Sequence, residues 1–158
     1  MGIFKHTQEV KLRVAAKSMF KALVTDMDSI PLPAAIKSID TLQGDGTSTG
    51  TIRRTNFADD VTGGYVKHKI EVVDTENYVS KHTLIEGPMI GDKIESIHYD
   101  SKFEHSSDGG CVAKIASEYH TKGDIQLNDE EIKATGDQVL VFYKLTEEYL
   151  LAHPDVCA

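Results

Sequence analysis

The sequence contains only two cysteines, Cys111 and Cys157, and no tryptophan among its 158 residues. Two cysteines cannot form the disulfide framework of a small secreted protein, and their spacing is not that of a metal-binding motif. No apolar run approaches the ~18 residues that a membrane-spanning helix needs. The first residues, MGIFKHTQEV, lack the apolar core of a signal peptide. We therefore expect a cytoplasmic protein with no metal site and no membrane partner.

Basic charge is also scarce. The chain has 17 Lys and Arg against 25 Asp and Glu, which gives a formal net charge of −8. Binding to nucleic acid requires a clustered basic surface, and the nearest approach to one is Lys67-His68-Lys69. We expect no nucleic-acid partner. A chain of this length without linker or repeat predicts one domain spanning residues 1–158.

The hydrophobic periodicity changes along the chain. Alternation over Ile3–Leu12 predicts a strand, and helical spacing from Ala15 to Val24 predicts a short helix. After two prolines, residues 34–39 could hold one further helical turn, followed by a strand over Ile39–Leu42. Alternation between turn residues predicts five more strands, at Thr51–Phe57, Tyr65–Asp74, Tyr78–Glu86, Lys93–Glu104 and Cys111–Thr121.

The last segment predicts a long helix. Asn128 and Glu131 have the spacing of a capping box, and the pattern ends near His153-Pro154. The apolar face of this helix is predicted to carry Ile132, Thr135, Val139, Phe142, Thr146 and Tyr149. The chain is therefore an α+β protein with a seven-stranded antiparallel sheet, two short helices and one long helix. A single helix cannot fill a strongly curved sheet, so we expect a large internal cavity.

Strand parity predicts which side chains face that cavity. His68 shares a face with Val66, Ile70 and Val72, and His82 shares one with Ser80 and Leu84. Either histidine could be a hydrogen-bonded interior residue or a polar contact for a ligand. The same parity directs two further groups inward: Tyr99, Ser101 and Phe103 on one strand, and Ala113, Ile115, Ser117 and Tyr119 on the next. Such a mixture of apolar and hydroxyl groups is typical of ligand pockets.

The glycine-rich segment GDGTSTGT at residues 44–51 does not match a nucleotide-binding motif. It has no lysine after Gly50, and its spacing is GxGxxxG rather than GxGxxG. A predicted strand follows it, so no helix N-terminus is available for a phosphate. We expect a loop between two strands in which the glycines adopt positive φ.

Several segments resemble the plant pathogenesis-related class 10 family, the family of the major birch-pollen allergen. They are the MGIF start, the GDGTSTGT loop, Ile85-Glu86-Gly87, the hairpin DGGCVAKI, the segment YHTKGD and the YLLAHPD end. The resemblance implies a helix-grip fold, with the sheet wrapped around the C-terminal helix and two short helices supporting its end. It also implies a large hydrophobic cavity that accepts cytokinins, flavonoids, steroids and similar plant metabolites.

Matching the cavity positions of the family onto this chain predicts a ligand-binding site formed by Leu23, Ile30, Arg53, Phe57, Tyr65, His68, Ser80, His82, Tyr99, Ser101, Thr135, Gln138, Val139 and Phe142. Ser80 and His82 stand where the family often has tyrosine, which opens that wall and makes it more polar. The glycine loop also departs from the family pattern at Thr47. The segment from Glu86 to Ile90 lacks the gate of the abscisic-acid receptors, so we do not expect a hormone-gated phosphatase inhibitor.

We expect an intracellular, defence-related and allergen-like protein that binds phytohormones or other small plant metabolites, without a cofactor or catalytic residues. We expect a monomer, and a dimer stays open. The alternative is a ribonuclease, with Glu95, Glu147 and Tyr149 as its candidate residues. A third possibility is a condensing enzyme of the alkaloid type, which needs a lysine inside the cavity. By parity, Lys102 and Lys114 point outward.

Overall fold

Seven antiparallel strands form one sheet in the order β1-β7-β6-β5-β4-β3-β2. The computed structural model describes residues 2–27, 30, 36–46, 48–58 and 64–158. The strands are β1 (Ile3–Leu12), β2 (Ile36–Gln43), β3 (Ile52–Phe57), β4 (Tyr65–Asp74), β5 (Val79–Glu86), β6 (Ile94–His105) and β7 (Cys111–Thr121). The helices are α1 (Ala16–Phe20), continued by the π-helical turn η1 (Lys21–Thr25), and the long α2 (Asp129–Ala152).

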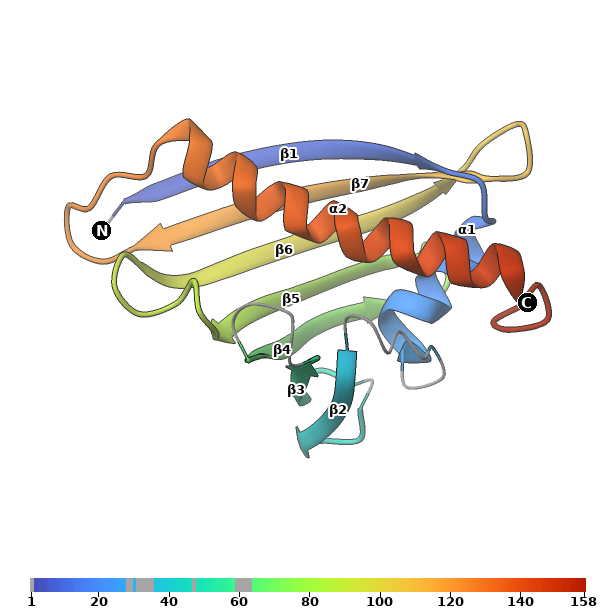
Figure 1. The fold of residues 1–158 in the computed structure, drawn as a ribbon, viewed down its shortest axis with the longest axis horizontal. Helices are drawn as coiled ribbons and strands as arrows, with labels where there is room; N and C mark the ends of the chain where they lie inside the picture. Colours follow the sequence, from blue (N-terminus) through green and yellow to red (C-terminus); the bar gives the residue numbers. More distant parts are fainter. Residues whose placement is uncertain (1, 28–29, 31–35, 47, 59–63) are drawn as a thin grey trace.

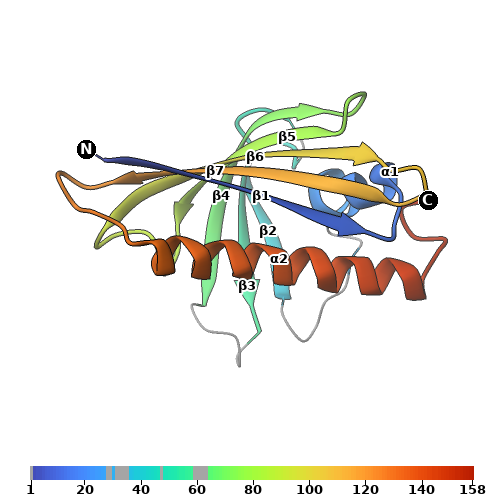
Figure 2. The same cartoon turned by 90° about the horizontal axis from the view of Figure 1, so that it is seen from above.

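The long helix covers one face of the sheet (Figures 1 and 2). Strands β1, β6 and β7 extend in roughly the direction of α2, whereas β3 and β4 cross it, so the sheet curves around the helix (Figure 2). We call the face toward α2 the concave face. The short helix α1 lies near the end of α2 that carries the C-terminus (Figure 1). Among the described residues, no helix has the length and apolarity to cross a membrane.

One part of the core lies at the α1 end of the concave face. Met19 and Phe20 of α1 are buried, and the Phe20 ring meets Phe103 of β6 edge to face with centroids 6.3 Å apart. Leu12 and Cys111, which pair at the ends of β1 and β7, are also buried. Burying an aliphatic or aromatic side chain of this size contributes about 1.5–3 kcal/mol. The end of the sheet next to α1 is therefore well packed.

Helix α2 begins with the predicted capping box. The side chain of Asn128 accepts the backbone N–H of Glu131 at 2.8 Å, and the Glu131 carboxylate accepts the backbone N–H of Asn128 at 3.1 Å. These bonds satisfy two amides that the first turn of a helix leaves without partners. Such a cap stabilises a helix by about 1 kcal/mol. The ion pair of Glu131 with Lys93 places the first turn of α2 beside the β5–β6 loop.

Three expectations need correction. Residues 36–39, part of the predicted second helical turn, belong to strand β2, and residues 31–35 lie outside the described part of the chain. Val72 is 40% exposed rather than inward, because the β4–β5 register shifts between Ile70 and Val72 and places Val73 against the core. Such a bulge moves the following side chains to the other face.

The third correction concerns the buried face of α2. The predicted face contains Thr135 and Thr146, which are buried, and Ile132, Val139, Phe142 and Tyr149, which are half-buried. The structure adds Tyr143, Glu147 and Leu150 to the buried side chains of the helix. The most buried line of α2 is therefore rotated by about one residue from the prediction over its second half.

Candidate ligand-binding site

Four polar side chains from neighbouring strands form a line across the concave face. Arg53 of β3 pairs with His68 of β4, and His82 of β5 pairs with Tyr99 of β6. The His68 and His82 rings meet edge to face with centroids 5.0 Å apart, and the His82 ring stacks on Tyr99 at 5.1 Å. We call these four residues the concave row. It brings together four of the predicted site residues.

The two histidines of the concave row are uncharged at neutral pH. Burial, with smaller contributions from the neighbouring His82 and Arg53, lowers the pKa of His68 to about 3. Burial lowers the pKa of His82 to about 4. A neutral imidazole carries one N–H donor and one acceptor nitrogen. The pair therefore offers both kinds of hydrogen-bonding group to the space under α2.

The guanidinium of Arg53 also has a structural role. It donates to the carbonyl oxygen of Val24 in η1 at 3.2 Å and to that of Gly46 in the glycine-rich loop. Arg53 thereby joins the helical turn, the loop and the sheet. Its positive charge stays within the concave row, where it acts on His68.

Hydroxyl groups continue the polar lining beyond the concave row. Ser80 and Ser101 face each other across β5 and β6, and both are buried. The hydroxyl of Tyr143, on α2, donates to Ser101 Oγ at 3.3 Å. Burial raises the pKa of Tyr143 to about 12 and that of Tyr99 above its ordinary value, so both stay protonated. Sequence reasoning missed Tyr143, although the i, i+4 series from Thr135 through Val139 leads to it.

Apolar side chains form the other wall of the site. The Phe57 ring of β3 stacks on Phe142 of α2, with centroids 5.8 Å apart and an interplanar angle of 29°. Leu23 and Val139 are half-buried and pack against the core, and Ile30 is buried in it. These five residues of the predicted set therefore lie between the helix and the sheet, or at the border of that space.

A cavity of about 360 Å³ lies beside the first half of α2. Thr135 and Gln138 of the predicted set line it, with Met89 from the β5–β6 loop and Tyr119 from β7. An ion pair between Lys93 and Glu131 (Nζ–Oε1 2.5 Å) borders it. Tyr119 pairs with Ile97 of β6, two residues from Tyr99, so the cavity lies next to the concave row.

The structure does not bring Tyr65 into this group. Its ring lies under the guanidinium of Arg54, 4.0 Å from the ring centroid. Arg54 alternates with the buried Arg53 along β3, and Tyr65 alternates with the buried Val66 along β4. Tyr65 therefore lies on the convex side, and thirteen of the predicted residues remain as candidates.

A model of the Pathogenesis-related protein Bet v 1 family matches residues 1–153. The chain belongs to the Bet v 1 family. It is 44% identical over 158 residues to the pathogenesis-related protein STH-2 of Solanum tuberosum, covering 100% of both chains. It is 41% identical to the major allergen Pru av 1 of Prunus avium, covering 98% of both. The crystal structure of Ara h 8.0201 superposes with a TM-score of 0.82 and 30% identity, covering 96% of this chain and 99% of that one.

The glycine-rich loop of this Bet v 1 family member is shaped by backbone conformation. Gly44, Gly46 and Gly50 have φ values of +85°, +100° and +91°. At Gly44 a Cβ atom would lie 2.9 Å from the Cα of Thr51, so this position excludes a side chain on two grounds. The loop leads into strand β3, as predicted, and not into a helix. This agrees with a connecting loop and gives no helix N-terminus for a phosphate.

The candidate ribonuclease residues do not converge. Glu95 is exposed near the start of β6, whereas Glu147 lies beside Arg13, which follows the end of β1. The end of β1 pairs through Cys111 with the far end of β6, and ten strand residues span about 33 Å. Tyr149 instead stacks on His153, with centroids 4.2 Å apart.

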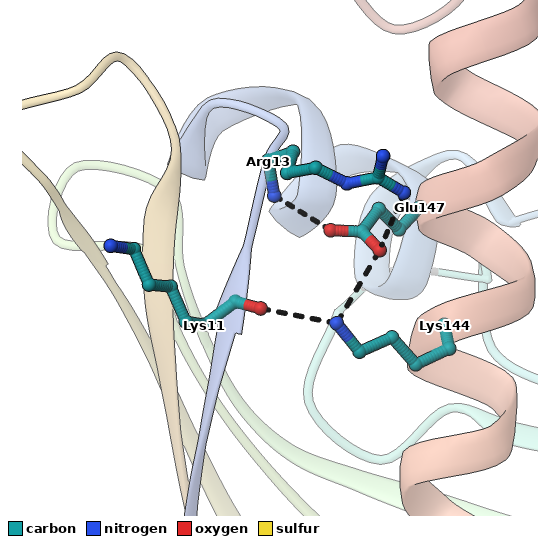
Figure 3. Close-up of polar contacts among 4 residues, drawn as sticks. All are labelled: Lys11, Arg13, Lys144 and Glu147. Atoms are coloured by element: carbon teal, nitrogen blue, oxygen red, sulfur yellow. Dashed lines mark hydrogen bonds and ion pairs between the residues drawn. The ribbon is translucent and has the colours of Figure 1, made fainter.

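Glu147 belongs to a closed polar cluster (Figure 3). Glu147 is 1% exposed, and its carboxylate accepts the backbone N–H of Arg13 at 2.6 Å and lies 3.4 Å from Lys144 Nζ. Lys144 also donates to the backbone carbonyl of Lys11 at 3.2 Å. Burial raises the pKa of Glu147, but the hydrogen bonds from Arg13 and the charges of Lys144 and Arg13 outweigh it, so the pKa is lowered overall. The cluster fastens α2 to the β1–α1 junction.

Two other features limit the chemistry of the described region. Lys102 and Lys114 both form ion pairs with Glu104 and retain about half of their side-chain surface, so neither offers an amine to the concave face. In the part of the chain that the structure describes, no cluster of His, Cys, Asp and Glu side chains could hold a metal ion.

Proposed function

We propose that the protein binds amphipathic small molecules between the concave face of the sheet and α2. The main support is the accessible surface that the side chains between the sheet and α2 retain. His68, His82, Val139 and Phe142 face the helix–sheet interior, yet each is only half-buried. Side chains in a close-packed interior keep almost no accessible surface. The surface that these residues retain supports a space between sheet and helix, with the 360 Å³ cavity beside α2 as its mouth.

The chemistry of the lining favours a planar ligand with a few polar groups. The stacked pair Phe57 and Phe142 supplies an apolar wall, and the concave row with Ser80 and Ser101 supplies donors and acceptors. Pockets for small molecules combine these two kinds of surface. We therefore propose phytohormones such as cytokinins, flavonoids and related metabolites as ligands, in a defence-related role in the plant cytoplasm. The separation of Glu95 from Glu147 supports binding rather than cleavage of RNA.

Titration calorimetry with trans-zeatin and with quercetin tests this function. Phe142→Ala removes one half of the apolar wall, and an aromatic contact is worth about 0.5–1.5 kcal/mol beyond its area, so we expect the Kd to rise about two- to tenfold. Val141→Ala is the matched control, because Val141 is the neighbouring residue of α2 and is 55% exposed.

Thermal unfolding of both variants checks that the fold is intact. Saturable binding that weakens in Phe142→Ala and not in Val141→Ala supports the site. The proposal fails if neither compound binds the wild-type protein, or if the two variants bind equally well.

A further inference from the structure

The concave row carries an unusual concentration of basic side chains for an interior surface. Arg53, His68 and His82 come from three neighbouring strands and lie in one line under α2. Interior surfaces rarely gather ionisable groups unless these have partners. In the described part of the chain, the ring contacts of the two histidines are to each other and to Tyr99.

Among the described residues, the charged and titratable groups beside the two histidines are an arginine and tyrosines. Arg53 of β3 lies on one side and Tyr99 of β6 on the other, and Tyr143 of α2 and Tyr119 of β7 act on Tyr99. No carboxylate among the described residues contacts either imidazole ring. The buried carboxylate of α2, Glu147, lies in the C-terminal half of the helix, where it forms ion pairs with Arg13 and Lys144.

We propose that the site is selective for amphipathic ligands with an anionic headgroup, which binds against His68 and His82 and is taken up together with a proton. This inference rests on the proposed function and narrows its ligand class. The ring system of the ligand would lie along the wall formed by Phe57 and Phe142. The headgroup would enter past Tyr119, which borders the cavity and lies next to Tyr99, the end of the concave row.

The proton follows from the electrostatics of the row. In the free protein, burial holds the pKa values of both histidines far below neutrality, and the neighbouring His82 and Arg53 add to the effect at His68. An anion within ~4–6 Å favours the protonated form and raises a histidine pKa by about one to three pH units. One proton then moves from solvent to an imidazole nitrogen, and a buried imidazolium–anion pair forms without net charge. The affinity for an anion therefore rises as the pH falls, by at most about tenfold per pH unit for each proton taken up.

Two fluorescent probes separate this inference from the function on which it rests. 8-Anilinonaphthalene-1-sulfonate carries a sulfonate that stays ionised throughout the useful pH range, so any pH dependence of its binding reports on the protein. N-phenyl-1-naphthylamine has the same ring system without the anion. If the anion raises the pKa of His82 by about two pH units, titrations between pH 7.5 and pH 5.0 should show an affinity for the sulfonate that rises at least about fivefold, with less than about a twofold change for the neutral amine.

Variants assign the effect to the row. His82→Gln and His68→Gln keep a hydrogen-bonding amide but do not titrate, so the variant of the histidine that takes up the proton should reduce the pH-dependent gain to below about twofold. His98→Gln is the matched control, because His98 lies on the neighbouring strand, is exposed and bonds to Thr83 outside the row. It should keep the full gain. Binding of the neutral amine by all three variants shows that the cavity is intact.

The outcomes are distinct. If neither probe binds, the proposed function fails. If the amine binds but the sulfonate shows no gain at low pH, the cavity stands and the anion selectivity is wrong. If the gain persists in both His82→Gln and His68→Gln, the proton is taken up elsewhere and the assignment to the concave row is refuted.

Discussion

Replacing Glu147 by glutamine tests how α2 is held against the rest of the chain. The substitution keeps the shape of the side chain and removes its charge. A hydrogen bond to a charged group contributes about 1.5–3 kcal/mol net, against about 0.5–1.5 for a neutral one. The bond from the Arg13 amide at 2.6 Å is the main one affected. Arg13 and Lys144 keep about 70% and 49% of their side-chain surface, so water can solvate their charges in the variant.

We therefore expect Glu147→Gln to lower the free energy of unfolding by about 1–2 kcal/mol at pH 7. In a chain of this size that corresponds to a fall in Tm of about 2–8 °C. Urea unfolding followed by circular dichroism measures the free energy. Glu148→Gln is the control, because Glu148 is the next residue and is exposed, and it should change stability by less than about 0.5 kcal/mol.

The pH dependence gives a second check on the same substitution. The pKa of Glu147 is lowered in the folded protein, so its contribution is present above the ordinary carboxylate pKa and is lost as the pH falls through the folded value. The difference between wild type and Glu147→Gln should then shrink in acid. A variant as stable as the wild type at pH 7 would refute the reasoning, since it would mean that desolvation of the carboxylate cancels its hydrogen bonds.

Two further predictions concern local structure and thiol reactivity. Gly44→Ala should lower the free energy of unfolding by about 2–5 kcal/mol, because of the positive φ and the overpacking against Thr51. Gly109 has a positive φ but open space around it, so Gly109→Ala should lower the free energy of unfolding by only about 1–2 kcal/mol. Equal urea midpoints for the two variants would contradict the predicted clash. Burial, with a smaller contribution from Glu147, raises the pKa of Cys111 to about 11, so Ellman's reagent at pH 8 should modify the half-buried Cys157 in the native protein and Cys111 only in urea. A Cys157→Ser variant that still reacts rapidly would show that Cys111 is accessible.

Strand parity predicted much of the concave face because the register is regular there. The bounds of β1, β4 and β7 agree with the sequence patterns, and His68 and His82 lie on the predicted side. Val72 does not, because parity reverses at a bulge between Ile70 and Val72 that no residue type in β4 announces.

Contacts that depend on the assembled fold could not be predicted from local patterns. Glu147 reads as a surface residue of a helix, since a carboxylate is rarely buried. It becomes interior only because the amide of Arg13, 134 residues away, supplies the hydrogen bond. Tyr65 was assigned to the site by family resemblance, although its own parity with Lys67 and Lys69 places it on the convex side with Arg54.

The register shifts described above divide the sheet into a regular half and an irregular half. Strands β1 and β7 pair over ten consecutive residues without a break, whereas the β2–β3 and β4–β5 ladders each contain two irregularities. Because bulges increase bending and twist, curvature concentrates in the half of the sheet that carries Arg53, His68 and His82. Helix α2 is held to the rest of the chain near both ends, by the ion pair of Glu131 with Lys93 and by Glu147. We expect the half of the sheet that contains the register shifts to bend when a bulky ligand binds. The amide protons of β1 and β7 should continue to exchange slowly with solvent.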